Sequence, residues 1–257
     1  MITGALLTRL RNLIRPTVRN NRSGTTVAVS ALNGDARKRV MVFGDSNAFR
    51  PDGNNMCWPA LLEDKDSLRL NVINESYNGR TTCYDSDECH GLSIIGREIR
   101  RHAPLDYVIV MLGTNDVKKK YGPPGAAEIA DSMLRIIEFI REDSGGAEPI
   151  FLTPPPMGEV VAGDLAGGHV RIPSVVAEYR LLARTRDIRL VDLHAILDAD
   201  TDLESDMIHL NAVGRQKVAD AVWDNLQLLH IPRLNSFPEC AEHDDSFVHI
   251  SSGGNRS

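Results

Sequence analysis

Residues 39–49 read "RVMVFGDSNAF", an apolar run that stops abruptly at Gly-Asp-Ser. The run is rich in Val and does not alternate apolar with polar residues, which is typical of a strand buried on both faces of a sheet. A strand that ends here places the hydroxyl of Ser46 at the edge of that sheet. Gly-Asp-Ser is also common in turns, so the stretch alone leaves open whether Ser46 is a nucleophile or a turn residue.

Four further apolar runs follow, and stretches with helical spacing separate them. The expected strands cover residues 39–43, 70–74, 107–112, 149–153 and 188–193, and the expected helices cover about 56–64, 92–102, 125–142, 172–186 and 212–229. Strands that alternate with helices predict an α/β domain whose parallel sheet is covered by helices on both sides. We expect one domain at 35–232, a basic leader at 1–34 and a polar C-terminal tail at 233–257.

The composition is that of an ordinary globular protein. The 257 residues are 42% hydrophobic and 25% charged, and the net charge of −6 gives no reason to expect a nucleic acid as partner. No stretch approaches the roughly 20 apolar residues of a membrane-spanning helix. The four cysteines are too few and too scattered for a disulfide framework or a structural zinc site. We therefore expect a reduced, cytoplasmic setting.

The leader has a composition of its own. Residues 1–34 carry five arginines and no acid, and residues 4–15 place Leu and Ile on one side of a helix and polar residues on the other. This pattern suits an organelle-targeting segment, or a helix in which residues 1–15 touch a membrane surface. A poorly ordered leader, or a helix packed on another subunit of a homo-oligomer, accounts for it equally well.

Polar residues stand just after several of the expected strands, where open parallel sheets bind their ligands. Ser46 follows the first strand, Gly79 the second and Asn115 the third, and Asp206 and His209 come after the fifth. A serine hydroxyl needs a neighbouring base in order to attack a carbonyl, and a histidine oriented by a carboxylate supplies that base. The sequence therefore predicts that Ser46, His209 and Asp206 form a catalytic triad.

The oxyanion that forms when a carbonyl is attacked needs hydrogen-bond donors. We expect the backbone N–H groups of Ser46 and Gly79 and the side-chain amide of Asn115 to supply them, because glycine lets a ligand approach its backbone closely. Three neighbouring residues are candidates for substrate binding: Asp45, Asn47 and Thr114.

Three rival sites have less support in the sequence. Asp192 and His194 follow the fifth strand, but no serine motif accompanies them, so we expect structural roles. Cys83 and Cys89 lie near the predicted site without the partners of a thiol nucleophile. A metal site would leave the oxyanion residues without a role. Its ligands would be Asp45, Asp116, Asp206 and His209, whereas we expect Asp116 to brace the loop that holds Asn115.

Four short motifs together resemble the SGNH (GDSL-type) hydrolase family. They are "GDS" at 44–46, "NGRTT" at 78–82, "GTND" at 113–116 and "DMIH" at 206–209, in the order found in the family. "GRTT", "VIVMLGTND" and "WPALLE" are similar to the branch of bacterial arylesterases and acyltransferases. The resemblance implies a flavodoxin-like, three-layer α/β/α sandwich with a five-stranded parallel sheet. It also implies that the protein uses no metal and no other cofactor.

The resemblance and the residues lead to one functional expectation. We expect a serine carboxylic-ester hydrolase that cleaves small-molecule esters, short-chain or aryl, through an acyl-enzyme, with acyl transfer to an alcohol as a possible second activity. A carbohydrate O-acetylesterase of the same fold is the nearest alternative, and a non-catalytic binding module is a more distant one. The connection at 153–173, rich in Gly and Pro, is either a substrate loop or a surface insertion.

Overall fold

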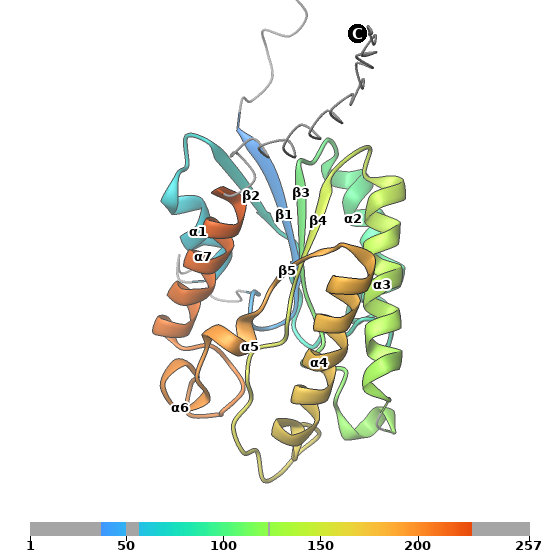
Figure 1. Ribbon diagram of the computed structural model, residues 1–257, viewed down its shortest axis with the longest axis vertical. Coiled ribbons are helices and arrows are strands. Elements are labelled where there is room, and N and C mark those ends of the chain that lie inside the picture. Colours follow the sequence, from blue (N-terminus) through green and yellow to red (C-terminus); the bar gives the residue numbers. More distant parts are fainter. Residues whose placement is uncertain (1–36, 50–56, 123, 228–257) are drawn as a thin grey trace, which may run out of the picture. The chain divides into compact units, whose positions relative to one another are not determined.

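Five parallel strands form the centre of the structure, in the order β2-β1-β3-β4-β5 (Figure 1). The computed structural model describes residues 37–49, 57–122 and 124–227, so the predicted leader and tail, with Cys240, lie outside the described residues. The strands are β1 (Lys38–Gly44), β2 (Leu70–Asn74), β3 (Tyr107–Met111), β4 (Glu148–Leu152) and β5 (Arg189–Val191). The predicted five-stranded parallel sheet is confirmed.

Helices cover both faces of this sheet. In Figure 1, α1 (Trp58–Lys65) and α7 (Ala212–Gln227) lie on one side, and α2 (Gly91–His102), α3 (Ala126–Asp143) and α4 (Gly168–Arg186) lie on the other. The short helices are η1 (Asp87–Cys89), η2 (Lys119–Tyr121), α5 (Leu193–Ile196) and α6 (Ala199–Asp202). None of the helices in the part of the chain that the structure describes has the length and apolar character needed to cross a membrane.

The central strands show why apolar runs without alternation correctly predicted strands buried on both faces of the sheet. In β1, Val40 and Val42 face the core beneath α1 and α7, whereas Met41 and Phe43 face the core beneath α2, α3 and α4. All four side chains are fully buried. Because successive side chains of a strand point to opposite faces, a sheet with two covered faces needs apolar residues at every position.

Two predicted boundaries were wrong in detail. The fourth long helix begins at Gly168 and not at residue 172, and Pro173 lies inside it. Proline inside a helix removes one backbone donor and its ring crowds the carbonyl four residues earlier, and the burial of Ile172, Val175 and Val176 outweighs this cost. The connection after β4 is correspondingly shorter than 153–173. The fifth strand ends at Val191, because Asp192 accepts a hydrogen bond from the N–H of Ala195 and thereby caps α5.

The topology brings three loops to one edge of the sheet. β1 lies between β2 and β3, and all three strands run in the same direction. Their carboxyl ends, which carry Ser46, Gly79 and Asn115, therefore share one edge at the point where the strand order reverses.

Candidate active site

A tight turn at the end of β1 presents Ser46. The carbonyl of Asp45 accepts hydrogen bonds from the N–H groups of Ala48 (3.1 Å) and Phe49 (2.8 Å). The carboxylate of Asp45, which is 1% exposed, accepts the N–H of Asn47 at 2.9 Å. The backbone on either side of Ser46 is therefore fixed by Asp45, and the serine side chain leaves the turn toward the shared edge of the sheet.

The side chains of Ser46, His209 and Asp206 form a continuous chain of hydrogen bonds. His209 Nε2 lies 2.9 Å from Ser46 Oγ, and His209 Nδ1 lies 2.5 Å from Asp206 Oδ2. An ionised carboxylate only accepts, so Nδ1 carries the ring hydrogen of the neutral imidazole and Nε2 accepts from the serine hydroxyl. This is the tautomer in which a histidine can take a proton from serine.

Hydrogen bonds within the turn from 206 to 209 stabilise it. Asp206 Oδ1 accepts the backbone N–H groups of Ile208 and His209, each at 3.0 Å. Burial raises the pKa of Asp206, but hydrogen bonds from the His209 ring, the His209 N–H and the Ile208 N–H outweigh it, and the pKa lies below its usual value. Asp206 is therefore a carboxylate at neutral pH, as the orienting partner of an imidazole must be.

Asn47 joins the serine turn to the histidine turn. Its side-chain oxygen accepts the N–H of Leu210 at 2.9 Å, and its side-chain NH₂ donates to the carbonyl of Ile208 at 3.4 Å. The sequence analysis placed Asn47 among the substrate-binding candidates, but its side chain is buried and engaged on both sides of His209. A residue in this position fixes the distance between Ser46 and His209.

Asn115 and Gly79 lie beside each other at the ends of β3 and β2. The side-chain NH₂ of Asn115 donates to the carbonyl of Arg80 at 3.2 Å and to the carboxylate of Asp45 at 3.4 Å. Gly79 has φ +77°, a conformation that suits glycine and turns its N–H away from the strand direction. Within the described ranges 37–49, 57–122 and 124–227, no residue accepts a hydrogen bond from the N–H of Gly79 or of Ser46.

Of the remaining predicted site residues, Thr114 is buried at the end of β3. Asp116 Oδ1 accepts the N–H (2.9 Å) and the hydroxyl (2.5 Å) of Thr82. Burial raises the pKa of Asp116 to about 6 against these two bonds, and burial likewise raises the pKa of Asp45 to about 6. Asp116 thus ties the loop after β3 to the loop after β2, which confirms its predicted bracing role.

The role of Arg80 was not predicted from the sequence. Its guanidinium is buried and donates to the carbonyls of Glu75 (2.5 Å), Glu88 (2.9 Å) and Gly44 (3.3 Å), and it lies 4.1 Å from the centre of the Phe43 ring. Burial lowers the pKa of Arg80 to about 10. The sequence could have predicted this role, because Arg80 directly follows Gly79 in "NGRTT". A cation at this position can bind the free carbonyls of neighbouring strand ends.

The rival pair after β5 has structural partners. Asp192 forms an ion pair with Arg180 at 2.7 Å and caps α5, and the backbone N–H of His194 donates to Thr153 Oγ1 at 3.0 Å. Cys83 Sγ lies 2.8 Å from the hydroxyl of Ser132. These contacts agree with the structural roles that we expected.

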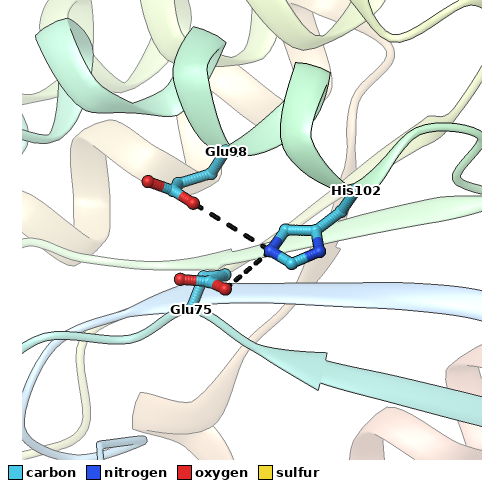
Figure 2. Close-up of side chains that lie close together, drawn as sticks. All are labelled: Glu75, Glu98 and His102. Atoms are coloured by element: carbon cyan, nitrogen blue, oxygen red, sulfur yellow. Dashed lines mark hydrogen bonds and ion pairs between the residues drawn. The ribbon is translucent and has the colours of Figure 1, made fainter. Parts of the chain in front are cut away.

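A second cluster of potential metal ligands joins α2 to the end of β2. Figure 2 shows His102 Nε2 between Glu75 Oε1 (2.6 Å) and Glu98 Oε2 (4.0 Å). Glu98 also forms ion pairs with Arg97 (2.6 Å) and Arg101 (3.4 Å). Because two guanidinium groups already neutralise the carboxylate that a cation would need, this cluster is an ion-pair network that holds α2 in place.

This arrangement of elements is also found in known hydrolases. The family model described as "GDSL-like Lipase/Acylhydrolase family" matches residues 42–217. The Escherichia coli (strain K12) protein "Thioesterase 1/protease 1/lysophospholipase L1" is 24% identical over 206 residues, which cover 76% of this chain and 86% of that protein.

Two solved structures extend the comparison to the fold. A carbohydrate acetylesterase family member from Sinorhizobium meliloti is 25% identical, with a TM-score of 0.66 over 75% of this chain and 98% of that one. The inhibitor-bound M. smegmatis aryl esterase is 24% identical, with a TM-score of 0.67 over 75% of this chain and 99% of that one. The family match spans well over half of the sequence and includes every motif described above, so the chain belongs to the GDSL-like lipase/acylhydrolase family.

Proposed function

We propose that this family member cleaves short-chain or aryl carboxylic esters with Ser46 as nucleophile, His209 as general base and acid, and Asp206 as the residue that orients His209. The observation that carries the proposal is the pair of hydrogen bonds on the two ring nitrogens of His209, 2.9 Å to Ser46 Oγ and 2.5 Å to Asp206 Oδ2. Nucleophile and base lie within the distance at which a proton can pass between them.

The reaction has two halves. Ser46 Oγ attacks the ester carbonyl carbon while its proton passes to His209 Nε2. The C–O bond to the alcohol then breaks, and His209 gives that proton to the departing alcohol oxygen, which leaves an acyl group on Ser46. A water molecule repeats the attack with His209 again as base, the carboxylic acid departs, and Ser46 recovers its proton. An alcohol in place of this water would give acyl transfer instead.

The oxyanion of each tetrahedral intermediate is assigned to three donors: the N–H of Ser46, the N–H of Gly79 and the side-chain NH₂ of Asn115. Support comes from the hydrogen bond between Asn115 and the carbonyl of Arg80, which keeps the amide beside the Arg80–Thr81 peptide, directly after Gly79 and Arg80 in the chain. The N–H groups of Ser46 and Gly79 have no acceptor among the described residues, and the NH₂ of Asn115 would exchange its 3.4 Å hydrogen bond to Asp45 for one to the oxyanion. Donors held at the developing charge stabilise the transition state more than the substrate, which is the source of rate enhancement.

A second candidate substrate class is the O-acetylated carbohydrate. The similarity to the Sinorhizobium meliloti carbohydrate acetylesterase family member favours it, at the same fold coverage as the aryl esterase. The chemistry is unchanged, because an acetylated sugar hydroxyl is also a carboxylic ester. A panel of para-nitrophenyl esters of increasing acyl length, measured beside acetylated sugars, separates the two classes by kcat/KM.

The experiment that tests the proposal is the Ser46→Ala variant with para-nitrophenyl acetate. We expect cleavage to fall to the background rate and covalent labelling by a fluorophosphonate to disappear. Ser174→Ala, a change of the same size at an exposed serine of α4, serves as the control and should keep both activities. An active Ser46→Ala protein, or labelling of another serine, would disprove the assignment.

A further inference from the structure

Lys118 lies beside the proposed oxyanion loop. Its backbone N–H donates to the carbonyl of Asn115 at 3.2 Å, so Asn115 and Lys118 are the first and last residues of one turn after β3. A Cβ atom on Gly79 would lie 3.6 Å from Lys118 Nζ and 3.8 Å from Cys89 Sγ. The turn therefore delivers two side chains to the Gly79–Arg80 segment, the amide of Asn115 and the ammonium of Lys118.

The ammonium of Lys118 has carboxylates in its surroundings, those of Asp85 and Asp164, but makes no direct ion pair with them or with any other described residue. No residue within 37–49, 57–122 or 124–227 forms an ion pair or a side-chain hydrogen bond with it. The neighbouring Lys120, in contrast, is paired with Asp85 at 2.7 Å. Lys118 is half-buried, and burial followed by repulsion from Lys120 lowers its pKa, against the opposing influence of Cys89, Asp85 and Asp164.

A half-buried cation without a partner is costly to keep, because it has lost part of its hydration and gained no ion pair. An anionic group of a bound ligand would supply the missing ion pair. An ammonium offers three donors on a flexible stem, which suits a carboxylate or a phosphate that approaches from several directions. Gly79 has no Cβ, an atom that would lie 3.6 Å from this ammonium, so residue 79 itself places no side chain between the ammonium and the proposed oxyanion donors.

We propose that Lys118 is a substrate-binding residue that selects esters carrying a negatively charged substituent, such as a carboxylate on the acyl chain or on the alcohol part. This inference rests on the proposed esterase function and names the substrate class of that same site. The ion pair would hold the charged end of the substrate while the ester carbonyl lies between Ser46 and the oxyanion donors.

The test compares each anionic ester with a neutral ester of the same shape. On the acyl side, mono-para-nitrophenyl adipate is compared with its terminal amide, and on the alcohol side para-acetoxybenzoate is compared with para-acetoxybenzamide. The quantity read is the ratio of kcat/KM for the carboxylate to kcat/KM for the amide. We expect Lys118→Met to lower this ratio about tenfold in at least one arm, and the affected arm identifies which part of the substrate carries the charge.

Two further variants separate charge from other effects. Lys118→Arg keeps the cation and should keep the ratio within about threefold of the wild-type value. Lys119→Met removes an exposed lysine next in the chain and should leave the ratio unchanged. An equal loss for carboxylate and amide would make Lys118 a part of the oxyanion site, and an unchanged ratio in both arms would remove it from substrate binding. Either result overturns the inference.

A binding measurement keeps this inference separate from the esterase proposal. Calorimetry with the Ser46→Ala protein measures the binding of para-acetoxybenzoate and of mono-para-nitrophenyl adipate separately and requires no turnover. We expect binding of at least one of the two esters to weaken about tenfold when Lys118→Met is added, and binding of both to stay unchanged when Lys119→Met is added. If the wild-type protein cleaves no ester but this difference is present, the esterase proposal fails and the anion site stands. If esters are cleaved and the difference is absent, the anion site fails alone.

Discussion

The backbone N–H of Gly158 donates to the carbonyl oxygen of Met207 at 2.9 Å, and this bond ties the segment after β4 to the turn that carries Asp206 and His209. Met207 has φ +62°, an uncommon conformation for a residue with a side chain. A Cβ on Gly158 would lie 2.8 Å from the Cβ of Met207, which is closer than such atoms approach each other. The connection after β4 thus supports the histidine turn through a contact that only glycine permits.

Gly158→Ala should therefore lower esterase activity from outside the triad. The added methyl group must push the 206–209 turn away, and a shift of about 1 Å at His209 costs on the order of 10²-fold in rate. We expect kcat with para-nitrophenyl acetate to fall by at least tenfold while the protein stays folded by circular dichroism. Gly125→Ala, where a Cβ meets nothing within 4 Å, is the matched control. Equal activity of the two variants would contradict the positioning role.

Asp206→Asn should reduce kcat about 10³- to 10⁴-fold with little change in KM. An amide can donate to Nδ1 of His209, which favours the tautomer with hydrogen on Nε2, and that tautomer cannot accept the serine proton. Steady-state kinetics with para-nitrophenyl acetate measure the effect. Asp200→Asn, at an exposed position of α6, should behave as the wild type. A loss below tenfold for Asp206→Asn would assign the base a different orienting partner.

Asn115→Ala should lower kcat by about 10²- to 10³-fold, because one donor to the oxyanion is lost. The substrate carbonyl is less charged than the intermediate, so KM should change by less than the rate. The control is Asn78→Ala, an exposed residue that directly precedes Gly79. If KM alone rose for Asn115→Ala, the residue would bind substrate and would not stabilise the transition state.

Arg80→Met should weaken the fold as well as the activity. The guanidinium binds three backbone carbonyls, and charged donors contribute about 1.5–3 kcal/mol each when their loss leaves an acceptor buried. We expect the free energy of unfolding in urea to fall by about 3 kcal/mol or more. Arg100→Met, at an exposed position of α2, should change it by less than about 0.5 kcal/mol. Similar values for both variants would show that Arg80 does not brace the strand ends.

The Asp116 carboxyl should make the free energy of unfolding depend on pH. Its pKa is raised from 3.8 to about 6 in the folded protein, so the folded state binds this proton more tightly than the unfolded state. The resulting stabilisation is fully present below about pH 4 and is lost as the pH rises through about 6, on the order of 3 kcal/mol in all. Urea unfolding between pH 4 and 7 should therefore show a smaller decline for Asp116→Asn than for the wild type.

The control for this measurement is Asp131→Asn, an exposed carboxylate of α3 that should leave the pH profile unchanged. If Asp116→Asn and the wild type lost stability in parallel over this range, the buried carboxyl would have the same affinity for its proton in both states.

Sequence alone predicted the sheet well because each of its signals is local. The absence of alternation in β1 and β3 follows from two covered faces, and this is visible in any run of five residues. The start of α4 was missed for an equally physical reason. A proline inside a helix removes one backbone hydrogen bond and crowds the carbonyl four residues earlier, and whether the helix continues past it depends on packing that the local pattern does not contain.

In the site, too, local sequence signals predicted some features and tertiary packing decided others. Ser46, Gly79, Asn115, Asp206 and His209 could be named from their places after strands, because parallel strands bring their carboxyl ends to one edge. Their chemistry could be named because few side chains suit each role. The parts played by Arg80, Asn47 and Lys118 could not be read in this way, because each depends on which atoms lie opposite a long or adaptable side chain.

The sequence by itself thus determined the fold class, through periodicity, and the family, through the resemblance of its four motifs, and it predicted a set of reactive groups from residue types at strand ends. Only the tertiary structure decided how the groups are held: Asn47 between Ser46 and His209, Arg80 beneath the strand ends, Gly158 against Met207 and Lys118 beside Gly79. Contacts between residues far apart in the chain depend on the packing of the whole domain, and no local pattern encodes them.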